Sequence, residues 1–270
     1  MISSDKIAIT TNEISTDFDY AVEVGMKWGI NIFELKNVWN GSRVPAINKS
    51  QRARIIRIVK EKGIVISAIS PGGFITHRSN PMFECYKKII LPETIKFARE
   101  LNSKIIIVIC PYREEGDLPT VVPNWLVKDL KECSMLAKDA GLTICLENLT
   151  GTFADTGKNI LSVLEAVNIE NFKLNWDPGN CVKNEINPFP DTYNLLRHFV
   201  AHLHMKDVKV DHETGQRIFV PIGEGFIDWK GQIEAMIKDG YNGYFTIETH
   251  CLPNADNSYK NYMWIKNKFT

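Results

Sequence analysis

Several signals that would place this 270-residue chain in a specialised class are absent. Its six cysteines form no Cys-x-x-Cys pair, so we expect mostly buried thiols in a reducing compartment, without a paired-cysteine zinc or redox motif. The 32 basic and 32 acidic residues cancel, which leaves no excess charge for nucleic acid or an anionic membrane. No apolar run approaches the length of a membrane span. Residues 1–6 lack the basic and apolar segments of a secretion signal, so we expect a cytoplasmic protein.

Short β-rich segments alternate with longer segments of helical character along the chain. This alternation is typical of a parallel sheet whose strands are joined by helical crossovers. Strands are expected at residues 6–10, 30–35, 64–70, 104–110, 142–148, 172–177, 201–207 and 244–248. Helices are expected at residues 18–28, 50–62, 82–101, 124–140, 160–167, 192–199, 229–238 and 258–269.

Eight strands alternating with eight helices predict an α/β fold, a single (β/α)8 TIM barrel that spans residues 1–270. Eight parallel strands can pair first to last, which removes both sheet edges. The alternative is an open doubly wound sheet, but no Gly-x-Gly-x-x-Gly follows the first strand to bind a dinucleotide. No repeat, linker or low-complexity segment divides the chain.

Polar residues end four consecutive predicted strands: Glu147, Asp177, His204 and Glu248. In such barrels the active site is built at the carboxyl ends of the strands, and neighbouring strands lie about 4.8 Å apart. Three carboxylates and one imidazole suit one divalent ion, Mn²⁺ or Mg²⁺ first, with Co²⁺, Fe²⁺ or Zn²⁺ as options. A single acid at a strand end is more often a helix cap or a surface charge. Four at corresponding ends favour a cation site, because burying unpaired charges is costly.

The seventh predicted strand carries His202, His204 and Lys206 on one face, because alternate strand residues point the same way. Strand parity alone does not separate the two histidines as ligands. His202 either supports the ligands or is an ordinary core histidine. Lys206 either holds an oxygen of the substrate or forms a structural ion pair.

Motifs in the second half of the chain carry a family resemblance. They are residues 145–148 (CLEN), 175–180 (NWDPGN), 202–207 (HLHMKD), 223–229 (GEGFIDW) and 244–248 (YFTIE). In this order they resemble the sugar phosphate isomerase/epimerase superfamily, the xylose-isomerase-like TIM barrels. That group contains ketose 3-epimerases, hydroxypyruvate isomerase, inosose dehydratase and endonuclease four.

The resemblance implies that Glu147, Asp177, His204 and Glu248 bind the metal, with Glu147 and Glu248 doubling as the acid/base pair. It implies an isomerase or epimerase of a small ketose, ketose phosphate or related hydroxy-ketone, acting through a metal-stabilised enediolate. The alternatives are a dehydratase of an inosose or dehydroshikimate-like substrate, and a non-catalytic sugar-binding barrel. The expected partner is a small sugar or sugar phosphate, and a homo-oligomer is an option.

Two departures from the family narrow the expectation. Ketose 3-epimerases place His three residues after the metal Asp and Arg six after the metal His, where this chain has Asn180 and Val210. Endonuclease four uses additional histidines, where the corresponding strand ends here show Ser70, Cys110 and Asn180. A free-ketose 3-epimerase and a trinuclear DNA-repair site are therefore disfavoured.

The candidates for substrate contact are Lys206, His202, Glu34, Arg113, Asn180 and His250. Glu34 lies near the end of the second predicted strand and is a candidate inward acid. Arg113 follows the fourth strand as a candidate anion anchor, although a surface arginine is the commoner role. His250 follows Glu248 by two residues and either lines the mouth of the barrel or enters solvent.

Overall fold

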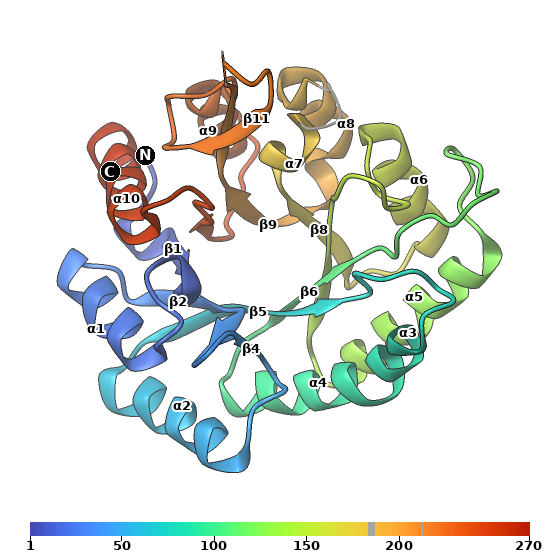
Figure 1. Ribbon diagram of the computed structural model, residues 1–270, viewed down its shortest axis with the longest axis horizontal. Helices are drawn as coiled ribbons and strands as arrows, with labels where there is room; N and C mark the ends of the chain where they lie inside the picture. Colours follow the sequence, from blue (N-terminus) through green and yellow to red (C-terminus); the bar gives the residue numbers. More distant parts are fainter. Residues whose placement is uncertain (183–186, 212) are drawn as a thin grey trace.

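The structure is a computed structural model and describes residues 1–182, 187–211 and 213–270. Eight parallel strands close into a barrel in the order β1-β12-β9-β8-β7-β6-β5-β2. Their bounds are β1 (Ile7–Thr10), β2 (Ile32–Leu35), β5 (Val65–Gly73), β6 (Ile105–Ile109), β7 (Thr143–Glu147), β8 (Phe172–Trp176), β9 (Val200–Met205) and β12 (Phe245–Ile247). The barrel predicted from the sequence is confirmed (Figure 1).

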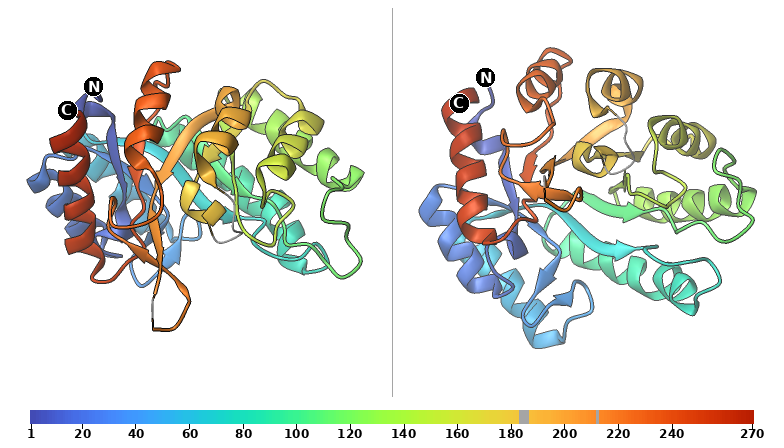
Figure 2. Two further views of the ribbon diagram at one scale, coloured as in Figure 1. Left: turned by 90° about the horizontal axis from the view of Figure 1, so that it is seen from above. Right: turned by 45° about the horizontal axis from the view of Figure 1, so that its top comes forward.

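Helices form an outer ring around the barrel, as Figures 1 and 2 show. The longer ones are α1 (Phe18–Trp28), α2 (Lys49–Lys62), α4 (Leu91–Glu100), α5 (Asn124–Asp139), α6 (Gly157–Val167), α9 (Trp229–Lys238) and α10 (Asn254–Phe269). Shorter ones are α3 (Pro81–Cys85), α7 (Pro178–Val182) and α8 (Tyr193–Leu196). Each strand thereby buries its outer face against helices and its inner face in the barrel.

The strands are apolar because both of their faces are covered. In β6, Ile106, Ile107 and Val108 are all fully or almost fully buried. β1 pairs with β12 (Ile7 opposite Phe245) and with β2 (Ile9 opposite Phe33), which closes the cylinder. The inner face of β9 departs from this apolar pattern, because His202 and His204 are completely buried there. These inward polar residues indicate that the functional site lies at the centre of the barrel.

Two of the predicted helices differ in detail. The helix expected at 82–101 consists of α3, a π-helical turn (Tyr86–Ile90) and α4, and Pro92, which has no N–H to donate, follows the π-helical turn directly. The helix expected at 192–199 is split among a π-helical turn (Pro188–Thr192), α8 and a 3-10 turn (Arg197–Phe199).

Two small antiparallel hairpins were not predicted. β3 (Asn37–Val38) pairs with β4 (Ser42–Arg43) after β2, and β10 (Asp207–Val210) pairs with β11 (Arg217–Val220) after β9. Both follow the carboxyl ends of barrel strands, so their residues stand at the mouth of the barrel. The carboxylate of Asp207 accepts hydrogen bonds from the backbone of Gly223, Gly225 and Ile227, which fixes the loop after β11.

All six cysteines are free, and five of them are buried, as expected from their scattered positions. None of the helices in the described part of the chain is both long enough and apolar enough to span a bilayer.

Candidate metal centre

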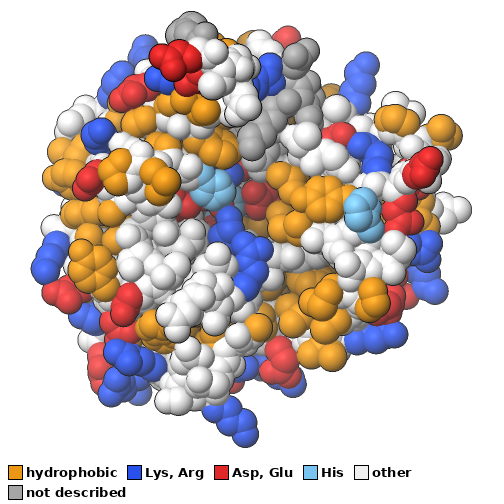
Figure 3. Space-filling model, in the orientation of Figure 1, with side chains coloured by type: hydrophobic (Ala, Val, Ile, Leu, Met, Phe, Trp, Pro, Cys, Tyr) orange, Lys and Arg blue, Asp and Glu red, His pale blue; other side chains and the backbone are white. Residues whose placement is uncertain are grey.

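Charged side chains and a histidine gather in a hollow near the centre of one face of the molecule (Figure 3). A pocket of about 240 Å³ opens here, and its polar lining includes Lys36, Arg43, Glu147, Asn180, Lys206 and His250. The carboxyl ends of β2, β7 and β9 supply or directly precede several of these residues. The location is the one at which TIM barrels place their active sites.

The four residues expected at the strand ends meet below this pocket. One ligand atom from each of Glu147, Asp177, His204 and Glu248 lies within 4.8 Å of the corresponding atom of every other. Glu147 is 5% exposed, and the other three are completely buried. Ligands bonded to one ion at ~2.0–2.2 Å lie up to ~4.4 Å apart, so only a slight contraction would place all four around a cation.

His204 presents one ring nitrogen to this cluster. Its Nε2 lies 2.9 Å from Glu34 Oε2, which directs Nδ1 toward the acids. Nδ1 lies 3.2 Å from Glu248 Oε2 and 3.5 Å from Glu147 Oε1. A carboxylate behind the imidazole fixes the ring orientation and raises its basicity, which is the arrangement of metal-ligating histidines. Although burial alone would lower it, Glu34, Glu248 and Glu147 raise the pKa of His204 well above its usual value.

Two lysines neutralise part of the acidic cluster. Lys206 Nζ lies 2.7 Å from Asp177 Oδ2 and 2.5 Å from Glu248 Oε2, and the side chain is 2% exposed. Lys36 Nζ contacts the other oxygen of Glu248. Although burial alone would raise it, Lys206 and Lys36 lower the pKa of Glu248 well below its usual value. Burial and the neighbouring carboxylates raise the pKa of Asp177, although Lys206 opposes this.

The donor set and its charge fit a divalent cation. With His204 neutral, the cluster has a net charge of minus two, which one divalent ion would cancel. This charge is the sum over the two lysines and the four carboxylates, Glu34, Glu147, Asp177 and Glu248. Asp177 Oδ2 and Glu248 Oε2 are buried and accept no well-directed hydrogen bond from any described residue, although Lys206 is close. Lys206 is the cation that these two oxygens meet here, and the negative charge that remains on the buried cluster is what a divalent ion would cancel, so the donor set fits a metal.

The chain around Asp177 is held by asparagines and requires a glycine. Asn148 accepts a hydrogen bond from the Asp177 backbone N–H at 2.9 Å and donates one to its carbonyl at 2.8 Å. Asn180 donates to Glu147 Oε1 at 3.3 Å, and its N–H donates to Asp177 Oδ1 at 3.1 Å. A β-carbon on Gly179 would lie 2.3 Å from Lys206 Cγ, so only glycine lets the lysine stem pass.

Two of the expected substrate contacts lie behind the cluster instead of on the pocket wall. Glu34 and His202 are completely buried, and Glu34 Oε2 accepts from His202 Nε2 at 3.0 Å. Although burial alone would raise it, His204 and His202 lower the pKa of Glu34 to about 2. Glu34 and His202 had both been candidates for substrate contact, and that expectation is corrected because their position makes them supports of His204, which for His202 was the other role expected.

Arg113 does not reach the site. It forms an ion pair with Asp155 at 2.5 Å, donates to the carbonyl of Pro119 at 2.9 Å and stacks on Phe153. These contacts hold the guanidinium in the loops around β6 and β7, so its expected role as an anion anchor is corrected to a structural one.

Asn180, Lys206 and His250 line the pocket, as expected for residues at the strand ends. The ring of His250 is about one-third exposed, and its Nε2 lies 3.4 Å from Glu248 Oε1 and 3.4 Å from Glu13 Oε1. The sequence reasoning missed Lys36 and Arg43. Lys36 was detectable, because it shares strand parity with Glu34; Arg43 was not, because it lies in the unpredicted hairpin.

The closed (β/α)8 barrel, with buried carboxylates and an imidazole at the carboxyl ends of its strands, defines the chain as a TIM barrel with a polar site at that end. A family model for xylose isomerase-like TIM barrels matches residues 21–268, so the chain belongs to this family.

Two curated relatives illustrate the chemistry within the family. Inosose dehydratase of Geobacillus thermodenitrificans is 25% identical over 192 residues, which cover 61% of this chain and 63% of that protein. L-ribulose-5-phosphate 3-epimerase UlaE of Escherichia coli is 23% identical over 209 residues, 74% of this chain and 70% of the relative. The chain matches between 49% and 63% of the length of the first curated relatives.

Solved structures show the same fold. The probable 3-DHS dehydratase AsbF of Bacillus anthracis superimposes with a TM-score of 0.77 at 18% identity, over 97% of this chain and 99% of that one. A Mycobacterium smegmatis barrel in complex with magnesium gives 0.76 at 17% identity, over 99% and 98%. The IOLI protein with a bound zinc atom gives 0.74 at 17% identity, over 97% and 95%.

Proposed function

We propose that this protein is a divalent-metal-dependent isomerase or epimerase of a small ketose, ketose phosphate or related hydroxy-ketone. The observation that carries the proposal is the convergence of Glu147, Asp177, His204 and Glu248 on one buried point. Relatives that act on small sugars support it. The ion we propose is Mn²⁺ or Mg²⁺ first, because oxygen ligands dominate, with Co²⁺, Fe²⁺ or Zn²⁺ as alternatives.

A cation held by these residues would polarise the carbonyl of the substrate and stabilise negative charge on its oxygen. Glu147 lies on the pocket wall, where its carboxylate can take the proton from the carbon next to the carbonyl. Asn180, which contacts Glu147 Oε1, orients that carboxylate. Return of a proton to the same carbon from the opposite face by Glu248 gives an epimer, and return to the neighbouring carbon gives an isomer.

One observation favours a dehydratase as the second candidate. Both oxygens of Glu248 contact lysines, and its lowered pKa makes it a weak base. Among the described residues that line the pocket, Glu147 is the one carboxylate, and His250 supplies an imidazole to the same pocket. One base and one imidazole suffice to remove a proton and to protonate a departing hydroxyl, which is elimination of water.

The test is solvent-deuterium exchange with a panel of ketoses, ketose phosphates, inososes and dehydroshikimate in the presence of Mn²⁺. Exchange together with a product of the same molecular formula as the substrate indicates an isomerase or epimerase. A product that lacks one water indicates the dehydratase. Glu147→Gln is expected to abolish exchange, whereas Glu61→Gln, at an exposed position on α2, retains it. If no substrate of the panel exchanges deuterium with the solvent and no metal binds, the proposal is overturned in favour of a non-catalytic barrel.

A further inference from the structure

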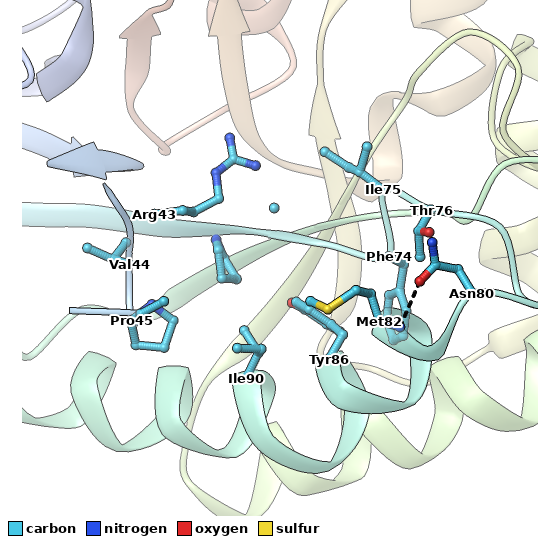
Figure 4. A pocket seen from close by; sticks show the side chains of 13 residues that line it. Arg43, Val44, Pro45, Phe74, Ile75, Thr76, Asn80, Met82, Tyr86 and Ile90 are labelled. Carbon is cyan, nitrogen blue, oxygen red and sulfur yellow. Dashed lines mark hydrogen bonds between the residues drawn. The ribbon is translucent and has the colours of Figure 1, made fainter. Parts of the chain in front are cut away.

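A second and larger cavity adjoins the catalytic pocket. Its volume is about 460 Å³, within the ~300–1,000 Å³ that is usual for small-molecule sites. It lies between β4, the end of β5 and the segment from Asn80 to Ile90, and its walls are mainly apolar, with Val44, Phe74, Met82 and Ile90 among them. In Figure 4, Arg43 and Ile75 lie along one edge, and Met82, Tyr86 and Ile90 lie along the opposite edge.

Arg43 and Ile75 line both the cavity and the catalytic pocket, so the two spaces share a border. One molecule can therefore occupy both. The catalytic pocket alone, at about 240 Å³, holds little more than the reacting part of a small sugar. The shared border makes the cavity an extension of the proposed substrate site.

The guanidinium of Arg43 stands at this border and forms no ion pair with a described residue, although Glu147, Glu248 and Glu34 act on it electrostatically from farther away. Its Nε donates to Asn37 Oδ1 at 3.1 Å, and the two remaining nitrogens form no hydrogen bond or ion pair with any described residue. A β-carbon on Gly72, whose φ is +73°, would lie 1.9 Å from Arg43 Nη1, so this glycine permits the guanidinium to lie against the backbone. A fixed, unpaired guanidinium is suited to a carboxylate or a phosphate.

The wall of the cavity also includes Tyr86, whose hydroxyl is buried beside Gly73. Tyr86 is 5% exposed and lines the cavity, and its hydroxyl has no hydrogen-bond partner among the described residues. Burial raises the pKa of this phenol well above its usual value, so it stays a neutral donor. A buried hydroxyl without a partner is costly, so a small shift of the Tyr86 ring that brings it to an oxygen of a ligand would lower this cost.

We propose that the cavity is a second substrate subsite, which binds an apolar substituent, and that Arg43 at its border binds an anionic group of the same substrate. The substrate class is thus a small hydroxy-ketone that carries a carboxylate or phosphate monoester next to an apolar portion. This inference rests on the proposed function for the reacting end of the molecule, whereas the subsite itself is tested by binding alone.

The experiment measures equilibrium binding of benzoate, phenyl phosphate, inorganic phosphate and the neutral isostere benzamide to the full chain with Mn²⁺ present. Benzoate or phenyl phosphate is expected to bind at least tenfold more tightly than benzamide, and the better of the two identifies the anionic group. Arg43→Gln is expected to weaken binding about 10- to 100-fold, the range for charge-assisted hydrogen bonds. Arg43→Lys is expected to retain part of the affinity for the anionic probes. Ala46→Trp, at an exposed position of the lining, is expected to block the cavity and abolish binding without altering the core.

Arg57→Gln is the matched control, because Arg57 is an exposed arginine on α2. Equal binding of benzoate and benzamide, or benzoate binding that Arg43→Gln leaves unchanged in a folded protein, overturns the subsite. Failure of the probes to bind while deuterium exchange occurs refutes the subsite and leaves the proposed function standing. Binding that depends on Arg43 without any exchange supports the subsite and refutes the proposed function.

Discussion

Replacing Lys206 by methionine should destabilise the metal-free protein and make it more responsive to metal. The ammonium is 2% exposed and lies 2.7 and 2.5 Å from the carboxylates of Asp177 and Glu248, so its removal leaves the buried Asp177 unpaired and Glu248 with Lys36 as its remaining lysine. Breaking a buried ion pair costs ~3–5 kcal/mol. At ~2–4 °C per kcal/mol, the melting temperature in EDTA should fall by roughly 6–20 °C.

Manganese should restore much of this loss. In the wild-type protein, an ion at a hundred times its dissociation constant stabilises the fold by ~2.7 kcal/mol, or roughly 5–10 °C. In Lys206→Met the shift should be larger, because the cation no longer meets a neighbouring ammonium and replaces the missing positive charge. Thermal unfolding with EDTA and with Mn²⁺ measures both effects.

Lys27→Met is the control, since this lysine also pairs with a glutamate but is 69% exposed. It should leave both melting temperatures close to those of the wild type. The reasoning is refuted if Lys206→Met and the wild type have the same melting temperature in EDTA, or if Mn²⁺ stabilises the variant less than it stabilises the wild type.

Three further outcomes follow from the same contacts. Because the pKa of His204 is raised and a metal ligand must be unprotonated, the affinity for Mn²⁺ should increase about tenfold per pH unit as the pH rises toward that pKa. Calorimetry in buffers of different ionisation enthalpy should detect about one released proton per bound ion. An affinity that does not change with pH would contradict this. Arg113→Ala should lower the free energy of unfolding by ~1–3 kcal/mol through loss of the ion pair with Asp155, and it should leave the affinity for Mn²⁺ unchanged. Weaker Mn²⁺ binding by this variant would show that Arg113 contributes to the metal site. Tyr86→Phe should raise the melting temperature of the ligand-free protein by about 2–4 °C, because a buried unpaired hydroxyl is removed; a lower melting temperature would show that the hydroxyl has a partner.

The barrel was predictable because its signals are local. Each barrel strand is a short β-rich run, and most helices follow as amphipathic segments, so alternation alone gives the architecture. The β3–β4 hairpin escaped detection because its strands contain two residues each, too few to show a pattern. Arg43, which lies in β4, was therefore invisible as a site residue.

The four proposed metal ligands were predictable because they end consecutive strands, and parallel strands bring their carboxyl ends together. Depth and pairing were not predictable, because they depend on tertiary contacts. Glu34 could be placed inside the barrel but not behind His204, and the sequence contains no signal that Asp155 would pair with Arg113. For Lys206 both roles had been left open, and the structure shows the ion pair while keeping the residue on the pocket wall.

The most direct test of the metal centre is a calorimetric titration of the metal-free protein with Mn²⁺, in parallel with Asp177→Asn and Glu61→Gln. These variants each remove one carboxylate, the first from the buried cluster and the second from the exposed face of α2. One ion per chain should bind to the wild type and to Glu61→Gln, and binding should be lost or greatly weakened in Asp177→Asn. Absence of binding to the wild type, or equal affinity in all three proteins, would contradict a metal centre at Glu147, Asp177, His204 and Glu248.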